Sequence, residues 1–528
     1  MSAAAPTANG AGRPAPSHAH PPLTGSALVV GTLALSLATF MNVLDTSIAN
    51  VSIPAISGDL GVSPSQGTWV ITSFGVANAI SLPLTGWLTQ RFGQVRLFLA
   101  SIVLFVISSF LCGLAPNLQT LITFRVLQGF VAGPMIPLSQ TLLLSSYPAR
   151  KSGTALAFWG MTTLIAPVVG PLAGGWITDN IGWPWIFFIN VPIGLGAAFV
   201  TWTLYHRRET PTRKVPIDGV GLALLVLWVG SLQIMLDKGK ELDWFASDQI
   251  VALAIVAVIG FAFFLAWELT DAHPVVEVRL FARRNFLFAT TSIAVAYGLF
   301  FGNLVLLPLW LQQWMGYTAT QAGWALAPVG ALAMLLTPVV GRFVNRVDPR
   351  PIVTISFLVF ALVMYLRSLF TTETDLATIM VPTVIQGAAV ACFFIPLMAI
   401  ALSGLTPDRI AGASGLTNFA RITAGSFGTS ISTTLWEQRA SLHHSQLVEH
   451  LTRGDLSTDR FFDTATHAGL THEQALALLN RIVDTQAFTL SVDELFYLSA
   501  LLFLVLVGLV WLTRPQRGGL GAVDSGAH

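Results

Sequence analysis

The amino-acid sequence predicts an all-α integral membrane protein in which two six-helix bundles flank two extra central helices. Three observations lead to this fold class. Only 10% of the 528 residues are charged and 54% are hydrophobic, whereas soluble proteins average about 25% charged residues. Fourteen apolar runs are long enough to cross a bilayer, which takes about 20 residues. A sequence pattern in the first half of the chain also recurs in the second half.

The predicted membrane-spanning helices follow one another at short intervals, and an even number of them puts both termini on one side. We place them at 27–50, 67–89, 97–115, 118–146, 153–177, 184–205, 217–236, 248–270, 286–311, 322–345, 352–370, 378–402, 411–435 and 494–513. Residues 1–26 are rich in Ala, Pro, Gly and His and lack a signal-peptide pattern, so we expect a disordered tail. Residues 514–528 form a second tail.

The distribution of basic residues indicates which side holds the termini. Eighteen Lys and Arg residues lie in the two tails and in the loops that follow even-numbered spans. The short loops on the other side contain only Lys238 and Lys240. Because cytoplasmic loops retain Lys and Arg, both termini are predicted to be cytoplasmic. The net charge of +1 gives no field that would favour nucleic acid.

The loop at 436–493 is long and polar, unlike the other loops. Residues 460–470 and 471–487 are expected to be helical, and Thr471 with Gln474 resembles a capping box. Long loops in compact proteins are usually functional or disordered. Two alternatives stay open for this segment: docking of a partner protein, or a solvated cap over the mouth of the pore.

An internal repeat supports the two bundles. The pattern "PLTGWLTQR" ends at Arg91 and "PVVGRFVNR" at Arg346, while "VLQG" places Gln128 and "VIQG" places Gln386. The two separations, 255 and 258 residues, are nearly equal. The domains are therefore predicted as follows: a first bundle at 27–205, two inserted helices at 217–270, and a second bundle at 286–513. Parallel halves of this kind typically carry a transport site between them, at the midplane.

Charged residues within predicted spans are costly and usually functional. Asp45 in the first span and Arg125 in the fourth lie at similar depth, roughly 8–10 Å from the outer surface at about 1.5 Å per residue. They can therefore pair. A structural salt bridge is one interpretation. The other is a proton switch, in which movement changes the burial of Asp45 or its distance from Arg125, and thereby its affinity for a proton.

Two further arginines lie in spans. We expect Arg367, close to the outer end of its span, to extend toward the lipid headgroups. Arg421 lies near the middle of its span, where it could balance Asp45, bind an anionic group of a substrate, or form a structural pair between the bundles. Polar residues predicted from their position to face a substrate cavity are Asn42, Asn303, Gln386 and Asn418, together with Arg421.

Small residues indicate close contacts between helices. "GFVAG" and "GPLAG" place Gly129 with Gly133 and Gly170 with Gly174 at the spacing that lets helix backbones approach. Pro167 and Pro171 are expected to kink the fifth span. The two cysteines lie in apolar runs, so neither a disulfide nor a metal site is expected.

Taken in order, several motifs resemble the major facilitator superfamily, most closely its fourteen-span drug:proton antiporter branch of the EmrB/QacA type. They are "LDTSIANVSIP", "GWLTQRFGQVRLF", "RVLQGFVAGPMIPLSQ", "APVVGPLAGGW", "WPWIFFINVPIG", "GSLQIMLDKGKELDWF" and "FARITAGSFGTSI". The resemblance covers nearly the whole chain after the N-terminal tail. It implies the major facilitator fold, a location in the inner membrane and transport driven by a proton gradient without a cofactor.

The resemblance also assigns roles to individual residues. Asp45 and Arg125 match positions linked to proton coupling. Two glycine-containing motifs match elements thought to shape or gate the conformational change: Gly170, Pro171, Gly174 and Gly175 in the fifth span, and Gly86, Arg91, Gly93 and Arg96 in the loop after the second span. Gln90 and Gln94 depart from the superfamily, which usually has an Asp and a basic residue there, so Arg91 needs another partner.

The sequence therefore predicts a proton-coupled exporter of hydrophobic or amphipathic drugs. Resemblance to this branch implies a periplasmic adaptor and an outer-membrane channel as partners in a tripartite system. The alternative is an exporter of one endogenous metabolite, such as a siderophore, a lipid or an antibiotic. A membrane-embedded enzyme is disfavoured, since the chain contains no nucleophile–base set, HExxH or Walker motif. A receptor is disfavoured by the absence of a signalling domain.

Overall fold

The computed structural model describes residues 21–515 except 63, 149–150, 214–215, 217, 240, 272–273, 345, 450 and 452–455. All regular elements in this part of the chain are helices, as predicted for the all-α class. Most of the two predicted tails, residues 1–20 and 516–528, lies outside the described residues.

Within its described residues, the first bundle contains nine α-helical segments. They are α1 (Gly25–Asp59), α2 (Pro64–Gly67), α3 (Trp69–Phe92), α4 (Gln94–Gly113), α5 (Leu118–Ala132), α6 (Met135–Ser146), α7 (Ser152–Asn180), α8 (Trp185–Phe188) and α9 (Asn190–Tyr205). The fourth predicted span is divided into α5 and α6 at Gly133 and Pro134, because proline lacks the N–H that would continue the helix.

The inserted helices and the second bundle complete the fold. They are α10 (Gly219–Lys238), the 3-10 turn η2 (Trp244–Ala246), α11 (Asp248–Thr270), the 3-10 turn η3 (Val278–Ala282), α12 (Arg284–Gln313), α13 (Ala319–Phe343), α14 (Pro349–Arg367), α15 (Leu376–Ala401), α16 (Pro407–Glu449), α17 (Leu456–His467) and α18 (His472–Trp511).

In the described part of the chain, each predicted span lies mostly within helix. Within the described residues, twelve segments are long and apolar enough to cross a membrane. The other two predicted spans, 153–177 and 411–435, lie within α7 and α16. Both pack against helices of either bundle, α7 against α1 and α13 and α16 against α12 and α3. The chain is therefore a multi-pass membrane protein.

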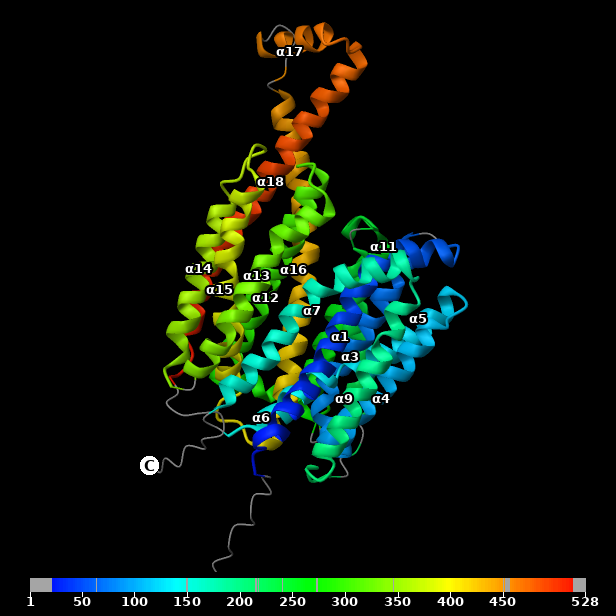
Figure 1. Ribbon diagram of the computed structural model, residues 1–528, viewed down its shortest axis with the longest axis vertical. Coiled ribbons are helices and arrows are strands. Elements are labelled where there is room, and N and C mark those ends of the chain that lie inside the picture. Colours follow the sequence, from blue (N-terminus) through cyan, green and yellow to red (C-terminus); the bar gives the residue numbers. More distant parts are fainter. Residues whose placement is uncertain are drawn as a thin grey trace, which may run out of the picture.

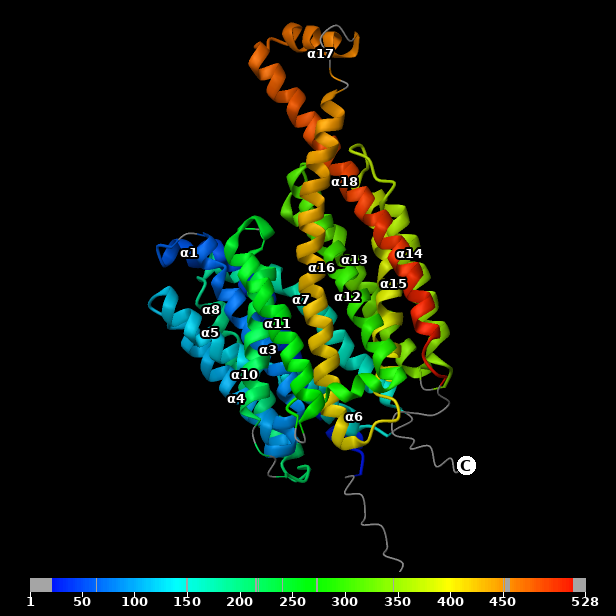
Figure 2. The ribbon, with the colours of Figure 1, turned by 180° about the vertical axis from the view of Figure 1, so that it is seen from behind.

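The two bundles stand side by side, and a helical hairpin extends from the second one (Figures 1 and 2). We call the end that bears this hairpin the hairpin face. The helix α1 begins, and α18 ends, at the opposite end (Figure 1), which we call the termini face. The two ends of the described chain thus share one face, as the even number of predicted spans requires.

The bundles touch through glycines in the halves of their helices near the termini face. A Cβ added to Gly86 of α3 would lie 2.9 Å from the Cα of Gly412 in α16, and one added to Gly341 of α13 would lie 2.7 Å from the Cβ of Ala157 in α7. Real side chains do not approach backbone this closely, so these glycines permit the contact. Leu156, Ala157, Val344 and Ile395 add an apolar cluster to this junction.

The segment at 436–493 corrects the expectation of a loop. The helix α16 continues without a break to Glu449, and α18 begins at His472, so the two predicted last spans extend beyond the bundle as an antiparallel hairpin capped by α17 (Figure 1). The predicted capping box of Thr471 and Gln474 is present. Arg439 of α16 binds Glu494 of α18 through two hydrogen bonds, of 2.7 and 2.9 Å.

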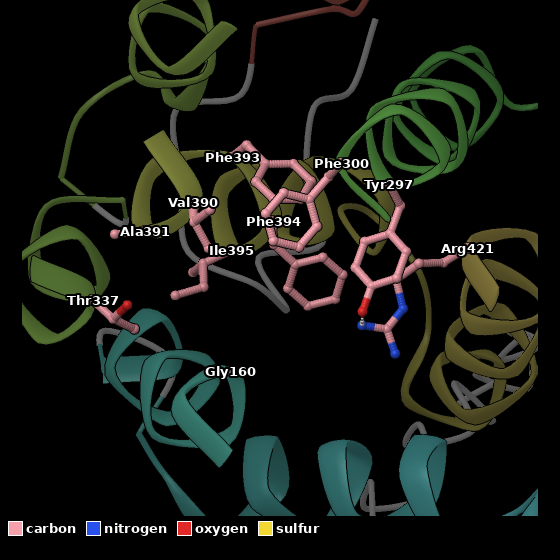
Figure 3. A pocket seen from close by; sticks show the side chains of 10 residues that line it. All are labelled: Gly160, Tyr297, Phe300, Thr337, Val390, Ala391, Phe393, Phe394, Ile395 and Arg421. Atoms are coloured by element: carbon pink, nitrogen blue, oxygen red, sulfur yellow. Dashed lines mark hydrogen bonds between the residues drawn. The ribbon is translucent and has the colours of Figure 1, made fainter. Parts of the chain in front are cut away.

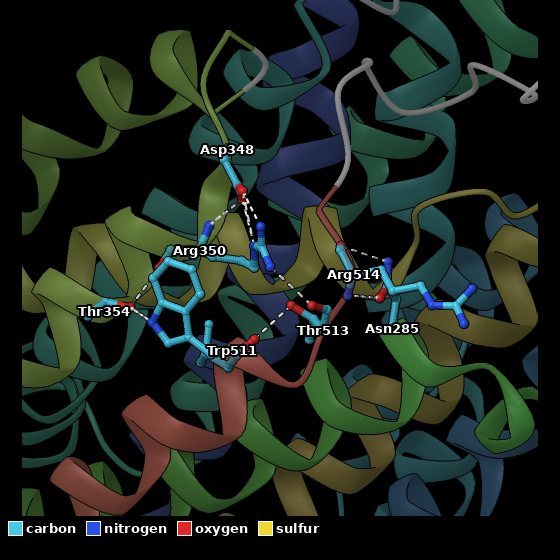
Figure 4. Close-up of polar contacts among 8 residues, drawn as sticks. Asn285, Asp348, Arg350, Thr354, Trp511, Thr513 and Arg514 are labelled. Atoms are coloured by element: carbon cyan, nitrogen blue, oxygen red, sulfur yellow. Dashed lines mark hydrogen bonds and ion pairs between the residues drawn. The ribbon is translucent and has the colours of Figure 1, made fainter.

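Polar contacts anchor the last helix at the termini face (Figure 4). The Arg350 guanidinium is held by Asp348 at 2.7 Å, lies 5.0 Å from the centroid of a Trp511 ring, and donates to the Thr513 carbonyl at 3.2 Å. The Arg514 amide donates to the Asn285 side chain at 2.7 Å. Together these contacts tie the end of α18 to α14 and α12.

Candidate functional site

The most strongly buried ion pair in the described chain joins the two residues singled out in the first and fourth spans. An Nη of Arg125 in α5 lies 2.6 Å from an Oδ of Asp45 in α1. The side chains are 0% and 1% exposed. Burying a charge without a partner costs several kcal/mol, so each residue makes the other tolerable in this position. The sequence indicated equal depth, and the structure places the two groups in direct contact.

Neutral polar groups complete the shell around the pair. Gln128 donates to Asp45 at 3.1 Å and accepts from Arg125 at 2.7 Å. Asn190, the first residue of α9, donates to the same Asp45 oxygen at 2.8 Å. The Nε of Arg125 donates to the Val70 carbonyl at 2.9 Å. The carboxylate of Asp45 thus accepts three hydrogen bonds in a site closed to solvent.

Close helix packing creates this site. A Cβ on Gly129 of α5 would collide with the backbone of Phe74 in α3, and one on Gly170 of α7 would collide with Ser47 of α1. These contacts confirm the packing expected from the two small-residue patterns. The ring of Phe74 lies 4.2 Å from the Arg125 guanidinium carbon, close enough for a cation–π contact.

Two members of the site were missed by the sequence reasoning as site residues. Gln128 lies in the repeat and Asn190 in the motif "WPWIFFINVPIG", but neither was predicted as a partner of Asp45. The repeated "VLQG" and "VIQG" patterns were the available signal for Gln128. Asn190 carried no comparable signal, because its position depends on how α8 and α9 fold back against α1.

The second bundle contains a related polar cluster without a carboxylate among its described members. Arg367 of α14 donates to Gln386 at 2.8 Å and to Thr383 at 3.0 Å, both in α15. At the 258-residue separation of the repeat, Asn303 corresponds to Asp45, and it donates to Ser499 at 3.0 Å. The repeat thus preserves a buried polar layer and replaces its acid by an amide.

Arg367 corrects a second expectation. It does not extend toward headgroups, because it is only 1% exposed. Its guanidinium points into the bundle, where it contacts Gln386, Thr383 and, at 5.9 Å, the ring of Phe496. A side chain near the end of a span can point toward the headgroups or into the bundle. Arg367 points into the bundle because α15 offers hydrogen-bond acceptors there.

A separate pocket lies between the bundles (Figure 3). Its cavity volume is about 20 Å³, room for about one water molecule, so the pocket is narrow in this conformation. Its lining consists of Gly160, Tyr297, Phe300, Thr337, Val390, Ala391, Phe393, Phe394, Ile395 and Arg421. Gly160 belongs to α7 of the first bundle and the other residues to the second, so relative movement of the bundles changes the shape of the pocket.

Arg421 is the charged residue of this pocket. Its guanidinium carbon lies 4.7 Å from the centroid of Tyr297 and 5.0 Å from that of Phe394, and an Nη donates to the Tyr297 hydroxyl at 3.3 Å. It is 3% exposed, and its Nε has no hydrogen-bond partner among the described residues. The pocket therefore presents a cation and aromatic rings on one side of the junction between the bundles.

The other four residues predicted to face a cavity make contacts within their own bundle. Asn42 donates to the Ala132 carbonyl at 3.0 Å, and Asn418 donates to the Ser414 carbonyl at 2.9 Å. Asn303 donates to Ser499 at 3.0 Å, and Gln386 accepts from Arg367 at 2.8 Å. Of the five predicted residues, Arg421 lines the pocket described above.

The predicted gating motifs occupy helix ends and helix crossings. Gly93 has a positive φ of 89° and separates α3 from α4, a conformation that favours glycine. Glu209 accepts hydrogen bonds from the amides of Val95 and, at 2.8 Å, Arg96. Arg91 lies 5.6 Å from the centroid of a Trp87 ring.

In the fifth span, Gly174 packs against Ile48 of α1, in the helix that carries Asp45. Gly175 is partly buried in the same helix, α7. Pro167 and Pro171 also lie within α7, but their side chains are outside the described part of the chain. The motif therefore holds α7 close to the helix of the buried acid.

Comparisons with known proteins agree with this architecture. The family model described as Major Facilitator Superfamily matches residues 35–429. The chain is 53% identical to the multidrug export protein EmrB of Escherichia coli K12, over 96% of this chain and 99% of that one. It is 49% identical to the fatty acid resistance protein FarB of Neisseria gonorrhoeae, over 95% and 99% of the two chains.

Solved structures share the fold at low sequence identity. A double-tryptophan mutant of XylE matches with a TM-score of 0.57 and 15% identity, covering 94% of this chain and 98% of the other. The human organic anion transporter MFSD10 matches with a TM-score of 0.56 and 12% identity, covering 92% and 98%. With the buried ion pair, the two bundles and the matches in sequence, this chain belongs to the major facilitator superfamily, in the branch of the EmrB-type export proteins.

Proposed function

We propose that this protein is a proton-coupled antiporter that exports hydrophobic or amphipathic drugs across the inner membrane. The observation that carries the proposal is the buried pair of Asp45 and Arg125, at 2.6 Å, in a chain half identical to multidrug export proteins. Ionisable residues inside membrane spans typically mark proton relays and substrate paths. Asp45 is the proton-binding residue in this mechanism, and Arg125 sets its affinity for the proton.

The distribution of basic residues supports a cytoplasmic termini face and a periplasmic hairpin face. The contacts through Gly86 with Gly412 and Gly341 with Ala157 close the bundles near the termini face. In alternating access, such contacts must break before a drug can enter from the cytoplasm. The pocket near Arg421 lies between the bundles, where a drug would be held during this exchange.

The energetics of this exchange are adequate. A proton that moves through 100 mV supplies about 2.3 kcal/mol, which supports a drug gradient of roughly tens-fold. The coupling requires that a proton on Asp45 and a drug in the pocket favour opposite states. No cofactor is required, because the proton gradient supplies the free energy.

A tripartite assembly is part of the proposal. The hairpin of α16 and α18 extends from the bundle and exposes apolar side chains: Leu442 on its stem, and Val448, Leu476 and Ile482 toward its tip. Exposed apolar groups on a projecting element are typical of protein-binding surfaces. We propose that a periplasmic adaptor, itself joined to an outer-membrane channel, docks on this hairpin.

A second candidate function is the export of a single endogenous or environmental amphipathic anion. The observation that favours it is Arg421, a buried cation with a free Nε in the described chain and aromatic rings on both sides. FarB, which is 49% identical, is named for fatty acid resistance. Comparing the transport of laurate, ethidium and a neutral dye by the same vesicles separates one dedicated substrate from a broad range.

The test of the proposed function uses the full chain in sealed, inverted membrane vesicles across which a proton gradient is imposed. We expect the native protein to accumulate ethidium against its gradient and Asp45→Asn to lose this uphill transport, because the amide cannot bind and release a proton. Ser109→Ala, which alters a neighbour that touches Asn190 and not Asp45, serves as the matched control. Uphill transport by Asp45→Asn at the native rate would contradict the proposal.

A further inference from the structure

The motif "GSLQIMLDKGKELDWF" at 230–245 has a conspicuous place in the structure that the proposed function leaves unexplained. It forms the last turns of the inserted helix α10 and the turn η2. This segment lies toward the hairpin face and contacts α3 of the first bundle and α16 of the second. It contains a second acidic residue in a membrane helix, Asp237, which is only partly exposed.

One side of this segment is bound to the first bundle. The Thr72 hydroxyl of α3 hydrogen-bonds to the Asp237 carboxylate. The ammonium group of Lys238 donates to the Thr68 hydroxyl at 2.5 Å and lies 5.4 Å from the centroid of the Trp69 ring. These contacts involve the first turn of α3 and the residue that precedes it.

The other side is bound to the second bundle. Gln233 donates to the Ser426 hydroxyl of α16 at 3.2 Å, and the Ser430 hydroxyl donates to the Leu236 carbonyl at 3.0 Å. The same Gln233 amide nitrogen lies 3.3 Å from an oxygen of Asp237, to which it donates. The carboxylate therefore accepts one hydrogen bond from the first bundle and a second from an amide that is held by the second bundle.

This position differs from that of Asp45. The partners of Asp45 come from α5 and α9, which belong to the same bundle as Asp45 itself. When two bundles rotate as rigid bodies, contacts inside one bundle are preserved. The partners of Asp237 lie on elements that move relative to each other, so the same rotation removes or restores hydrogen bonds to its carboxylate.

We propose that Asp237 is a second proton-binding carboxylate, located at the joint between the bundles, whose protonation is coupled to their rotation. The inference rests on the proposed proton-coupled export and adds a site to it. Hydrogen bonds to a carboxylate favour its charged form, so the state in which Thr72 and Gln233 reach Asp237 releases the proton. The state in which they separate binds it. By linkage, a proton on Asp237 favours that second state to the same extent.

The surroundings of Asp237 suit this role. The charged groups near it are Lys238 and Glu241, which form an ion pair at 2.9 Å on the same segment. The elements packed against it contribute neutral groups at this point: Thr72 from α3 and, through Gln233, Ser426 from α16. Lys238 and Glu241 move together with Asp237, so rotation of the bundles leaves these charges in place beside it. The rotation changes only the hydrogen bonds that link Asp237 to the two bundles.

The experiment measures protonated carboxyl groups directly, so that it does not depend on a substrate. Infrared difference spectra of the purified full-length protein in liposomes, between about pH 8 and pH 5, report the C=O stretch of carboxyls that take up a proton. We expect Asp237→Asn to remove one component of this band and Asp45→Asn to remove another. Glu241→Gln, the same chemical change one turn away on a more exposed carboxylate, should leave both components in place. A spectrum of Asp237→Asn identical to that of the native protein would overturn the inference.

A second variant keeps the carboxylate and alters only its donor. Thr72→Val should raise the pH midpoint of the Asp237 component by roughly half to one unit, the equivalent of one lost hydrogen bond. An unchanged midpoint would overturn the inference even if Asp237→Asn does not fold. In ethidium transport by the same liposomes, Asp237→Asn should move about one proton fewer per dye molecule than the native protein. If liposomes that contain the native protein show no proton-driven ethidium transport, the proposed function is refuted instead, whatever the infrared band shows.

Discussion

At the scale of single residues, the proposed mechanism makes the hydrogen bonds around Asp45 the determinants of how it binds a proton. Gln128 and Asn190 both donate to one of its oxygens, at 3.1 and 2.8 Å, and Arg125 binds the other. Each donor stabilises the charged carboxylate relative to the protonated one. In the proposed mechanism the two amides are therefore positioning residues that set the working pH, and Asp45 is the group that binds the proton.

Removing one amide donor should shift the pH dependence of transport without abolishing it. For Asn190→Leu we expect the pH of half-maximal ethidium efflux to rise by about half to one unit, because the protonated form of Asp45 is then relatively favoured. Efflux from liposomes at a series of pH values measures this. Ser109→Ala, which removes a contact to Asn190 only, should shift it less. A lowered midpoint would refute the assigned role of Asn190.

The two buried arginines should differ in what their loss costs. Arg125→Met leaves Asp45 buried without its counter-charge, a change that typically costs 3–5 kcal/mol, so we expect a large fall in thermal stability. Arg367→Met removes hydrogen bonds to Gln386 and Thr383 and no ion pair, which costs about 1–2 kcal/mol. Thermal unfolding of both variants in detergent tests the order of the two effects.

The pH dependence of that measurement provides the control. The loss caused by Arg125→Met should shrink as the pH falls, since Asp45 can then bind a proton and no longer holds an unpaired buried charge. The loss caused by Arg367→Met should be similar at all pH values. Equal losses for both variants at neutral pH would show that the Asp45–Arg125 pair contributes no more than its hydrogen bonds.

At the scale of helices, glycines determine which surfaces can meet. Gly86 of α3 faces Gly412 of α16 so closely that any side chain would force the helices apart. By contrast, a Cβ on Gly75 in the same helix would meet nothing within 4 Å. The contact of α3 with α16 near the termini face therefore depends on the absence of a side chain at this crossing point.

This contrast yields a matched pair of variants. Gly86→Ala should destabilise the state that is closed at the termini face and favour its opening, whereas Gly75→Ala should have little effect. Both changes improve helix propensity by a similar amount, so a difference between them reports the contact. Distances between spin labels on α3 and α16 near the termini face, measured in liposomes, should lengthen for Gly86→Ala only. Unchanged distances would exclude this crossing as a determinant of the closed state.

The hairpin of α16 and α18 is the other element with its own prediction. Its stem is held by Arg439 with Glu494 and by His444 with Asp484, at 2.7 Å in each case. These pairs keep the apolar distal half projecting away from the bundle. In the proposed assembly, this half contacts the adaptor and takes no part in the proton or drug steps.

Changing the apolar surface of the hairpin should therefore separate transport from resistance. We expect Leu476→Asp with Ile482→Asp to retain ethidium transport in vesicles but to lose drug resistance in cells, because the pump no longer joins its partners. Glu473→Gln, on the same helix, serves as the control. Loss of transport in vesicles would place the hairpin in the pump mechanism itself and contradict the docking proposal.

At the scale of the whole molecule, the repeat and the inserted helices have different consequences. The repeat preserves a buried polar layer in each bundle, with Asp45 and Arg125 in one and, 258 residues later, Asn303 and Thr383 in the other. Arg367 donates to Thr383. Only the first bundle then has a carboxylate in that layer among the described residues. The inserted helix α10 contacts both bundles, which places Asp237 where rotation of one bundle against the other changes its hydrogen bonds.

Much of the architecture could be predicted from the sequence because its physical causes are local. A run of about 20 apolar residues must form a helix in lipid, since each backbone polar group has to be paired within the segment. The spans, the capping box at Thr471 and the small-residue contacts of Gly129 and Gly170 follow from such local rules. The equal depths of Asp45 and Arg125 followed from counting residues along two helices.

The direction of a side chain around its helix could not be predicted in this way, because it depends on which neighbour offers a partner. Arg367 points inward because Gln386 and Thr383 accept its hydrogen bonds, and the amide nitrogens of Asn42, Asn303 and Asn418 donate within their own bundles. Asn190 reaches Asp45 only through the packing of α9 on α1. The sequence by itself determined the helices and the depth of each charge along them, because the bilayer imposes both. Only the tertiary structure decided the pairing of the charges, because a pair forms across helices that are distant in the chain.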